Sequence, residues 1–393
     1  MFPTAVFSSR SMRIIAALDS FKGSLTSREA GEACRSGIES VLPDADVKVV
    51  SVADGGEGTV EALTAAMNGY FVSCRVKGPL GEPVDAVYGV SADGKTAVME
   101  MSQASGITLI PESARNPLKT DTIGTGQMLA DAVARGCVKI IIGIGGSATV
   151  DGGIGMMSAL GVRFLDDCGQ DVVPCGAALG SISSIDAGAF DKMRRSCSIC
   201  IACDVNNPLT GANGAARVFG PQKGASNVMI GELEKGMCSY AHLLNDYAGR
   251  DVASEPGAGA AGGLGAALMA FFDAKLLPGG KLMLDTIGFD NIVAGADLII
   301  TGEGCLDRQT LMGKIPFEIL QAGLSCKIPV VAVGGCVENC DELLRAGFAC
   351  VRAAKPDEMP LAEAMLPERA KNNLARTCAM LMRSKAVSSA SSR

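Results

Sequence analysis

The stretch ADLIITGEGCLDRQTLMGKIP, residues 296–316, decides the fold that we expect for this chain. It begins with an apolar β-type run, Leu298 to Thr301, which is too short for a helix and ends at a glycine. We expect the tight turn Gly302-Glu303-Gly304 next, and then a polar segment that opens a helix. A strand, a glycine turn and a helix start together direct backbone N–H groups toward an anion.

Two carboxylates and a lysine give this predicted anion site its character. Glu303 and Asp307 are poor neighbours for bare phosphate but good ligands for the Mg²⁺ that accompanies one, and Lys314 adds the opposite charge. The alternative is that both carboxylates only favour the dipole of a capped helix. A Walker loop is excluded, because Ile315 follows Gly313-Lys314 where that motif has Ser or Thr.

Similar strand ends occur near the N-terminus. A strand predicted from Arg13 to Leu18 runs into Asp19-Ser20-Phe21-Lys22, and one from Asp46 to Val52 runs toward Asp54-Gly55-Gly56-Glu57. Ligands of parallel α/β sheets bind outside the carboxyl ends of the strands. Three strand ends of this kind therefore indicate a ligand site.

The middle of the chain has a different pattern. An antiparallel hairpin is predicted from Val84 to Val90 and Thr96 to Met101, and a buried strand from Lys139 to Ile142 leads into the glycine-rich loop 143–149. That loop could form a phosphate cradle from backbone N–H groups. Gly143, Gly145 and Ala148 also satisfy a relaxed dinucleotide pattern, as do Gly257, Gly259 and Gly262, but neither match has the strand and apolar helix that the motif requires.

Further elements follow in the second half of the chain. A strand predicted from Ser198 to Ala202 ends just before Asp204, and Lys223 stands in a turn. The Gly/Ala run from 257 to 267 suits a close-packed helix, and one closing helix is expected from Leu361 to Met382.

Composition excludes several classes of function. The 393 residues carry a net charge of −7, which argues against a general nucleic-acid or membrane-surface binder, and no apolar run approaches the roughly 20 residues that span a bilayer. The single histidine, His242, rules out a His-rich metal site and disfavours Ser-His-Asp hydrolysis. Fifteen cysteines, an odd number without metal-binding spacing, indicate free thiols in a reducing compartment.

We therefore expect an α/β fold with a Rossmann-like parallel-sheet domain formed by both chain ends, residues 13–70 and 290–384. A second, mixed α/β domain, residues 71–289, is inserted in it, and residues 1–12 and 385–393 are disordered ends. The active site is expected in the cleft between the domains. A cytoplasmic location is expected, with an organelle as the alternative that the short N-terminal extension suggests.

Seven motifs resemble those of the two-domain glycerate kinase family of bacteria, in the same order. They are DSFKGS, ADGGEGT, GIGGSAT-DGG, ACDV-NPL, VFGPQKGA, GAGAAGG and TGEG-LD-QT-GK-P. The resemblance covers nearly the whole chain and implies transfer of the ATP γ-phosphoryl group to D-glycerate with Mg²⁺, at the 2-hydroxyl, giving 2-phosphoglycerate. The sequence departs from the family pattern at Asp121, Gln127 and Val150.

Phosphoryl transfer needs held phosphates, a metal, a cation and a base, and this chain offers each without a histidine. We assign catalytic roles to Asp204 as general base, Lys22 as clamp and Asp307, and metal binding to Asp307 and Glu303. The residues expected to contact substrate or phosphate are Asp19, Ser20, Lys22, Asp54, Gly55, Gly56, Gly145, Gly146, Ser147, Thr149, Lys223, Gly302, Gly304 and Gln309.

The expected ligands are D-glycerate, ATP as co-substrate and Mg²⁺, with no nucleic acid and no membrane, and a homodimer is possible. Three alternatives stay open. They are a glycerate kinase that forms 3-phosphoglycerate, a dinucleotide-dependent oxidoreductase and a non-catalytic sensor of glycerate or nucleotide.

Overall fold

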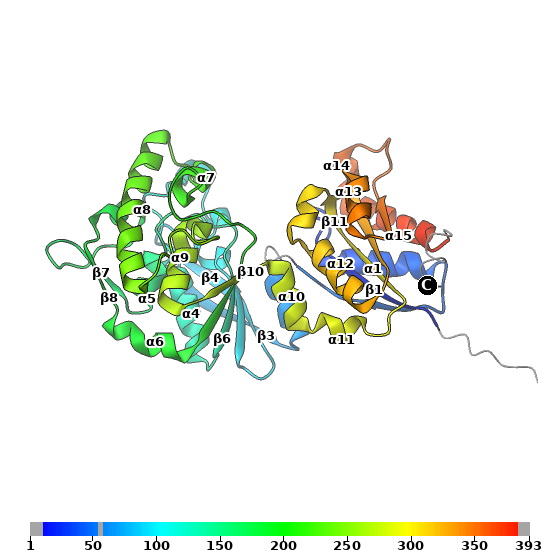
Figure 1. Ribbon diagram of the computed structural model, residues 1–393, viewed down its shortest axis with the longest axis horizontal. Coiled ribbons are helices and arrows are strands. Elements are labelled where there is room, and N and C mark those ends of the chain that lie inside the picture. The colour runs from blue at the N-terminus through cyan, green and yellow to red at the C-terminus, as the bar shows by residue number, and fades with distance from the viewer. Residues whose placement is uncertain (1–10, 54–57, 384–393) are drawn as a thin grey trace, which may run out of the picture. The chain divides into compact units, whose positions relative to one another are not determined.

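The computed structural model describes residues 11–53 and 58–383, which form two compact α/β units (Figure 1). The terminal unit combines both chain ends, residues 1–54 and 280–393, and the inserted unit is residues 55–279. The fold class is therefore the expected one. The boundaries differ, since residues 58–70 belong to the inserted unit and residues 280–289 to the terminal unit.

The expected disordered ends fall almost entirely outside the described residues. Ser11 and Met12 are the exceptions, and the Met12 carbonyl accepts a hydrogen bond from Asp46 N at 2.9 Å. Met12 therefore already belongs to the edge of the first sheet.

The terminal unit is built on a five-stranded parallel sheet with the order β13-β12-β11-β1-β2. Its strands are β1 (Arg13–Leu18), β2 (Asp46–Val49), β11 (Leu298–Leu306), β12 (Val330–Val337) and β13 (Cys350–Ala353). The chain steps from β1 to β2 on one side, and later from β11 to β12 and β13 on the other. The order reverses between β1 and β11, so these two strands flank the switch point at which ligands of open α/β sheets bind.

Helices cover both faces of this sheet. On one face, α1 (Ser27–Glu39) and α15 (Pro367–Arg383) pack on the even-numbered residues of β1 and β11, and the thiols of Cys34 and Cys378 meet at 3.4 Å. On the other face, α12 (Ile315–Cys326) lies against Ile299, which points away from its neighbour Ile300. The remaining helices of this unit are α10 (Gly279–Ile287), α11 (Phe289–Val293), the 3-10 turn η6 (Arg308–Met312), α13 (Cys340–Ala346) and α14 (Leu361–Ala364).

Local sequence signals explain several helix ends. Thr26 Oγ1 accepts from Glu29 N at 3.2 Å and Glu29 Oε2 accepts from Thr26 N at 3.0 Å, a capping box at the start of α1. The prediction of a single closing helix from Leu361 is wrong, because the helix is interrupted after α14. Pro367 disfavours helical backbone in the residue before it and starts α15 instead.

The predicted turn at Gly302-Glu303-Gly304 is also wrong. These residues continue β11, which pairs with β12 as far as Leu306 opposite Val337. The turn comes later, at η6. Gly302 serves the sheet, because a Cβ there would overlap the Val333 carbonyl oxygen on β12. Gly304 is less crowded, since the nearest atom to an added Cβ would be Phe21 Cα at 3.6 Å.

The inserted unit contains a six-stranded mixed sheet with the order β10-β9-β6-β5-β4-β3. β3 to β5 form an antiparallel meander, whereas the pairs β5-β6, β6-β9 and β9-β10 are parallel. The strands are β3 (Tyr70–Lys77), β4 (Pro83–Val90), β5 (Thr96–Glu100), β6 (Lys139–Gly143), β9 (Ser198–Ala202) and β10 (Lys275–Leu277), with a separate pair β7 (Arg163–Leu165) and β8 (Ser184–Asp186). The predicted hairpin and the strands near 139 and 198 are confirmed.

Helices and short turns surround this sheet. They are α2 (Thr59–Ala66), α3 (Ser102–Ser105), α4 (Ile123–Ala134), α5 (Ile154–Ala159), α6 (Asp191–Ser196), α7 (Ala215–Phe219), α8 (Asn227–Ala248), α9 (Ala260–Phe272) and the 3-10 turns η1 (Ile107–Leu109), η2 (Glu112–Ala114), η3 (Gly176–Ser181), η4 (Gly188–Phe190) and η5 (Pro221–Lys223). The Gly/Ala run from 257 to 267 is buried but only partly helical, because Ala261, Gly262 and Gly263 have left-handed backbone and regular helix in α9 begins after them. The start of α9 packs on the glycine-rich loop, where Gly152 N donates to Gly262 O at 2.9 Å.

The two glycines of β11 make separable predictions about stability. Gly302→Ala should lower the free energy of unfolding by on the order of 3 kcal/mol, because a backbone oxygen cannot move aside for the added methyl. Gly304→Ala, two residues along the same strand, should change it little. Denaturant unfolding of both variants checks this, and equal stability of the two would contradict the packing explanation.

Candidate active site

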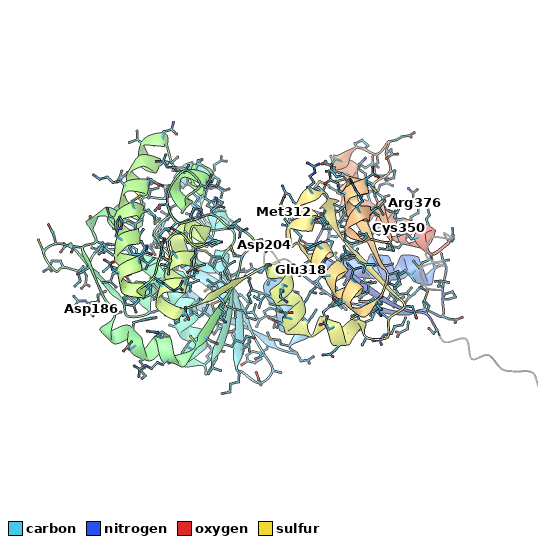
Figure 2. The ribbon with its side chains drawn as sticks, in the orientation of Figure 1. Asp186, Asp204, Met312, Glu318, Cys350 and Arg376 are labelled. Carbon is cyan, nitrogen blue, oxygen red and sulfur yellow. The ribbon has the colours of Figure 1, made fainter. Side chains whose placement is uncertain are left out.

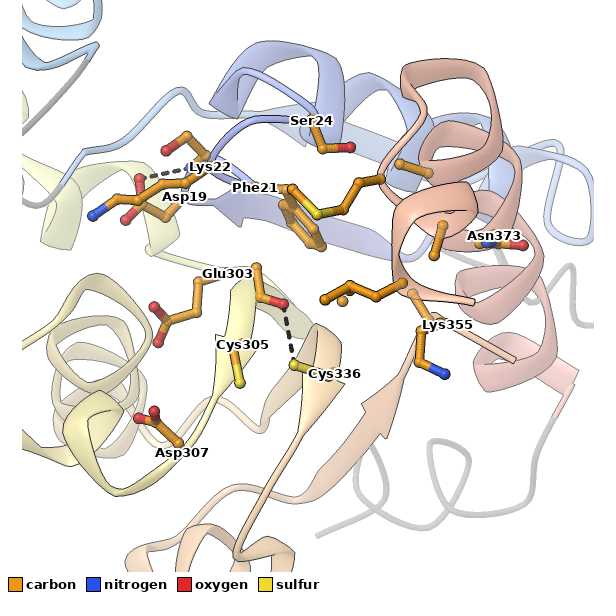
Figure 3. A pocket seen from close by; sticks show the side chains of 18 of the residues that line it. Asp19, Phe21, Lys22, Ser24, Glu303, Cys305, Asp307, Cys336, Lys355 and Asn373 are labelled. Carbon is orange, nitrogen blue, oxygen red and sulfur yellow. Dashed lines mark hydrogen bonds between the residues drawn. The ribbon is translucent and has the colours of Figure 1, made fainter. Parts of the chain in front are cut away.

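A cavity of about 360 Å³ lies in the terminal unit, next to the carboxyl ends of β1 and β11 (Figure 3). Its walls come from the loop after β1, from the distal halves of β11 and β12, and from the segment that holds α14 and the start of α15. The cavity therefore sits at the switch point of the sheet. Its volume falls within the range of small-molecule sites, about 300–1,000 Å³.

One side of this cavity is charged. Asp19, Lys22, Glu303 and Asp307 lie there together in Figure 3, and Lys314 joins them from the start of α12. The three carboxylates outnumber the two ammonium groups, so a bare polyphosphate would meet net repulsion. A metal-bound phosphate would not.

Asp19 is held close to the backbone at the end of β1. Only 3% of its surface is exposed, and its Oδ1 accepts a hydrogen bond from Ser20 N at 2.7 Å. Asp19 N in turn donates to the Gly302 carbonyl at 2.8 Å, which joins the loop after β1 to β11. The backbone of Asp19 is thus held by β11, and its carboxylate is held by the backbone N–H of the next residue.

Glu303 uses both of its carboxylate oxygens within the protein. Oε1 accepts from Thr310 Oγ1 at 2.7 Å, and Oε2 forms an ion pair with Lys314 Nζ at 3.0 Å. Burial raises the pKa of Glu303, and the bonds from Thr310 and Lys314 act in the opposite direction. Its main structural effect is to hold Lys314 at the cavity.

Asp307 caps the turn that follows β11. Its Oδ1 accepts from Gln309 N at 2.7 Å and Thr310 N at 3.2 Å, while Thr310 Oγ1 accepts from Asp307 N at 3.0 Å. Of the two carboxylates that could favour a capped helix start, Asp307 is the one that caps η6. Within the described part of the chain only Oδ1 is used, which leaves Oδ2 for a ligand.

The other side of the cavity is formed by residues that sequence reasoning had not assigned. Phe21 and Ser24 belong to the motif DSFKGS but carried no predicted role. Leu361 belongs to α14, Met365 follows it directly and Asn373 belongs to α15, a region where the sequence holds no recognisable motif. Long-range packing brings them to the loop after β1, so a local pattern could not have found them.

In the inserted unit, the glycine-rich loop after β6 is supported from below by a buried lysine. Lys223 is 2% exposed, and its Nζ donates to Ser147 Oγ and to the Thr149 carbonyl, both at 2.7 Å. Burial lowers the pKa of Lys223 to about 7. Gly145 and Gly146 are exposed above it. We had expected Lys223 and this loop to contact phosphate together. The structure shows instead that Lys223 Nζ is hydrogen-bonded to the loop itself.

Asp151, which had no predicted role, anchors the same loop from the other end. Its buried carboxylate accepts from Thr122 N and Oγ1 at 2.9 and 2.8 Å, from Gly153 N at 3.1 Å and from Gly155 N at 3.2 Å. Burial raises the pKa of Asp151 to about 6, although these donors favour the charged form. The loop is therefore fixed between two buried ionisable groups.

Asp204 stands just beyond the end of β9, also in the inserted unit (Figure 2). It is exposed, and its Oδ1 accepts from Gly279 N at 2.9 Å, where α10 begins. The bond holds Asp204 to the start of α10, away from the turn at 206–208 that follows it in the chain.

The other predicted site residues fall into two groups. Gly302 and Gly304 lie within β11, and Gln309 lies in η6, where its N–H is bound by Asp307. Asp54, Gly55 and Gly56 lie outside the described residues. The fifteen cysteines are free thiols, as expected.

Comparisons with known proteins agree with this architecture. The sequence profile of the glycerate kinase family matches residues 14–386. A glycerate kinase of Halalkalibacterium halodurans is 45% identical over 92% of this chain and 97% of its own length. A glycerate 2-kinase of Escherichia coli is 45% identical over 82% of this chain and 85% of its own. The crystal structure of a "putative glycerate kinase 2" from Salmonella typhimurium LT2 superposes with a TM-score of 0.85 at 42% identity, covering 95% of this chain and 98% of that one.

Fold, cavity and relatives together define an ATP-dependent phosphotransferase of mixed α/β architecture. The chain belongs to the glycerate kinase family. The family that the seven motifs indicated is thereby confirmed. The comparisons do not support the alternative of a dinucleotide-dependent oxidoreductase. Across residues 11–53 and 58–383, no helix combines the length and apolar character needed to cross a membrane.

The buried lysine makes a prediction about pH. The unfolded chain holds the Lys223 proton up to about pH 10.4, whereas the folded protein releases it near pH 7. Between these values the unfolded state binds more protons, so stability should rise with pH. Relative to Lys223→Met, the parent should therefore gain melting temperature from pH 7 to pH 10.

A matched control is Lys235→Met, which removes an exposed lysine from α8 of the same unit. This variant should follow the parent across the whole pH range. Parallel pH profiles for the parent and Lys223→Met would show that the Lys223 ammonium is not desolvated as described.

Proposed function

We propose that this protein transfers the γ-phosphoryl group of ATP to the 2-hydroxyl of D-glycerate and releases 2-phosphoglycerate. The observation that carries the proposal is the group of carboxylates and lysines at the switch point of the sheet, in a chain of the glycerate kinase family. The position of transfer is supported by the name of the Escherichia coli relative, glycerate 2-kinase. Transfer to the 3-hydroxyl is the second candidate.

The metal requirement follows from the charge of the cavity. We propose that Asp307, through Oδ2, and Asp19 hold Mg²⁺ together with phosphate oxygens and water, the usual Mg²⁺ arrangement. When bound, Mg²⁺ would neutralise charge on the phosphates. Glu303, the second metal ligand expected from the sequence, is assigned in this proposal to holding Lys314, because its Oε2 faces that ammonium and its Oε1 accepts from Thr310.

The cations have separate tasks in this proposal. Lys22 lies on the exposed loop after β1, where its ammonium can act as a point charge on the phosphates. In the inserted unit, Gly145, Gly146 and Ser147 would present backbone N–H and hydroxyl groups to an anionic part of the substrates. Lys223 would keep that loop in shape from below.

The general base is the least constrained assignment. The acceptor hydroxyl must lose its proton as the phosphoryl group arrives, and one carboxylate is sufficient for that task. We propose Asp204, because β9 and the bond to Gly279 N hold its backbone and leave its side chain exposed. Asp307 is the alternative base.

The reaction is tested by identifying its product. With ATP, Mg²⁺ and D-glycerate, ³¹P NMR of the reaction mixture should show 2-phosphoglycerate, with its phosphorus coupled to the single proton on C2. Coupling to two protons on C3 would instead establish the 3-phosphoglycerate-forming reaction. Absence of any phosphoglycerate would overturn the proposed function.

Substitution of the two carboxylates is expected to change different kinetic parameters. Asp307→Asn keeps an oxygen that can cap η6, so the protein should stay folded while half-saturation shifts to higher Mg²⁺.

Asp204→Asn keeps an acceptor for Gly279 N, yet kcat should fall by about a hundredfold or more, with little change in the KM for ATP. Steady-state kinetics with Mg²⁺ titration measures both.

Two results would reassign these roles. If Asp307→Asn loses activity while its Mg²⁺ titration is unchanged, Asp307 is not a metal ligand and becomes the base candidate. Near-parental kcat in a folded Asp204→Asn protein would exclude Asp204 as the base.

A further inference from the structure

We propose that the uncharged side of the terminal-unit cavity binds the adenine base of ATP, with the triphosphate directed toward Asp19, Lys22 and Asp307. This inference rests on the proposed function for the presence of ATP, and it adds the place and orientation of the nucleotide. It follows from three properties of the cavity: its division into two sides, its exposed apolar wall and two polar groups that lack good hydrogen-bond partners.

The cavity has two chemically distinct sides. In Figure 3 the side chains of Asp19, Lys22, Glu303 and Asp307 gather on one side, whereas Asn373 lies on the other, and Phe21 stands between them. ATP has the same division, with a flat aromatic base at one end and a chain of anionic phosphates at the other. Glycerate carries polar groups on every carbon and has no part that would gain from an apolar wall.

Large apolar side chains form this wall although solvent reaches them. Leu361 is 61% exposed and Met365 39%, and both line the cavity beside Ala364 and the buried ring of Phe21. An aromatic base inserted here would bury these surfaces together, which is the main source of affinity for apolar ligand parts. Leu361 and Ala364 belong to α14, a single turn that contributes no residue to the main core of the unit.

Two polar groups at this side lack good partners. Ser24 Oγ is shielded from solvent and makes no hydrogen bond to any described residue. Asn373 is 9% exposed, and its Nδ2 donates to the sulfur of Met359 at 3.4 Å, a weak acceptor. Adenine offers the amino donor N6 beside the ring acceptors N1 and N7, the pattern that an Asn carboxamide pairs with both of its polar atoms.

The lysine on this side does not compete for the phosphates. Lys355 Nζ donates to the carbonyls of Pro356, Asp357 and Met359 at 3.0, 3.4 and 3.2 Å, so its ammonium organises the loop at 355–359. The cations placed to meet phosphate are Lys22 and Lys314, on the charged side. Charge therefore fixes which way round the nucleotide binds.

The test fills the uncharged side and leaves the charged side intact. In Ala364→Phe, calorimetry without glycerate should show a Kd for ADP raised about tenfold or more, and kinetics a KM for ATP raised similarly, with the KM for glycerate unchanged. Ala346→Phe is the matched control, because Ala346 is a half-buried alanine on α13 of the same unit that does not line the cavity. It should bind ADP like the parent.

Two simpler probes separate base from phosphates. Adenosine should bind the parent and Lys22→Ala equally, and bind Ala364→Phe weakly. Tripolyphosphate with Mg²⁺ should show the opposite pattern, with binding lost in Lys22→Ala and kept in Ala364→Phe. Should Ala364→Phe fail to fold, Leu361→Ala removes part of the same wall from an exposed position, with Leu344→Ala on α13 as its control.

Several results would overturn the inference. Parental Kd for ADP in both Ala364→Phe and Leu361→Ala would exclude the base from this side, and a raised KM for glycerate alone would assign the cavity to the acceptor. Failure of the proposed function is distinguishable, because ADP and adenosine binding are measured without glycerate and do not depend on turnover.

Discussion

The close pairing of β11 with β12 is the constraint on which the candidate site depends. Gly302 lets the two strands approach without a side chain between them, and the pairing then continues to Leu306 opposite Val337. Because β11 runs on past the point where a turn was expected, it carries Glu303 into the protein and delivers Asp307 at its far end. Asp19 N bonds to the carbonyl of the same Gly302, so the loop after β1 is positioned by the same residue.

Ionic groups at this site are held by short local networks rather than by isolated ion pairs. Thr310 serves both carboxylates, since its hydroxyl donates to Glu303 and its N–H donates to Asp307. Lys314 is then fixed through Glu303. Such prearranged charges lose little freedom when a ligand binds, and this is the condition under which electrostatic stabilisation of phosphoryl transfer is effective. The glycine-rich loop of the inserted unit is held in a similar way, by hydrogen bonds to the buried ionisable groups of Lys223 and Asp151.

The sequence predicts much of this fold because its strands are short apolar runs with clear ends. The ranges of β1 and β9 were predicted without error, and the capping box of α1 follows from Thr26 and Glu29 alone. Gly302 was misassigned because a glycine required by a neighbouring strand looks like a turn glycine until the neighbour is known. The burial of Lys223 was not predicted for the same reason, since nothing in the sequence of its own turn shows that its Nζ will bond to Ser147. The sequence does not show that Ser24 and Asn373 line one cavity, because α15 and the loop after β1 come together only through long-range packing.

The discontinuity of the terminal unit also governs the order in which the protein can be assembled. Arg13 N bonds to Asp297 across a separation of 284 residues, and the Cys34 thiol meets a partner on the last helix. A ribosome adds about 5–20 residues per second, so β1 waits many seconds for the strand that lies beside it in the finished sheet. The whole of the inserted unit, residues 55–279, is synthesised during that interval. Folding of residues 55–279 into one compact unit replaces a long flexible connection between β2 and β11, which lowers the entropic cost of closing that connection.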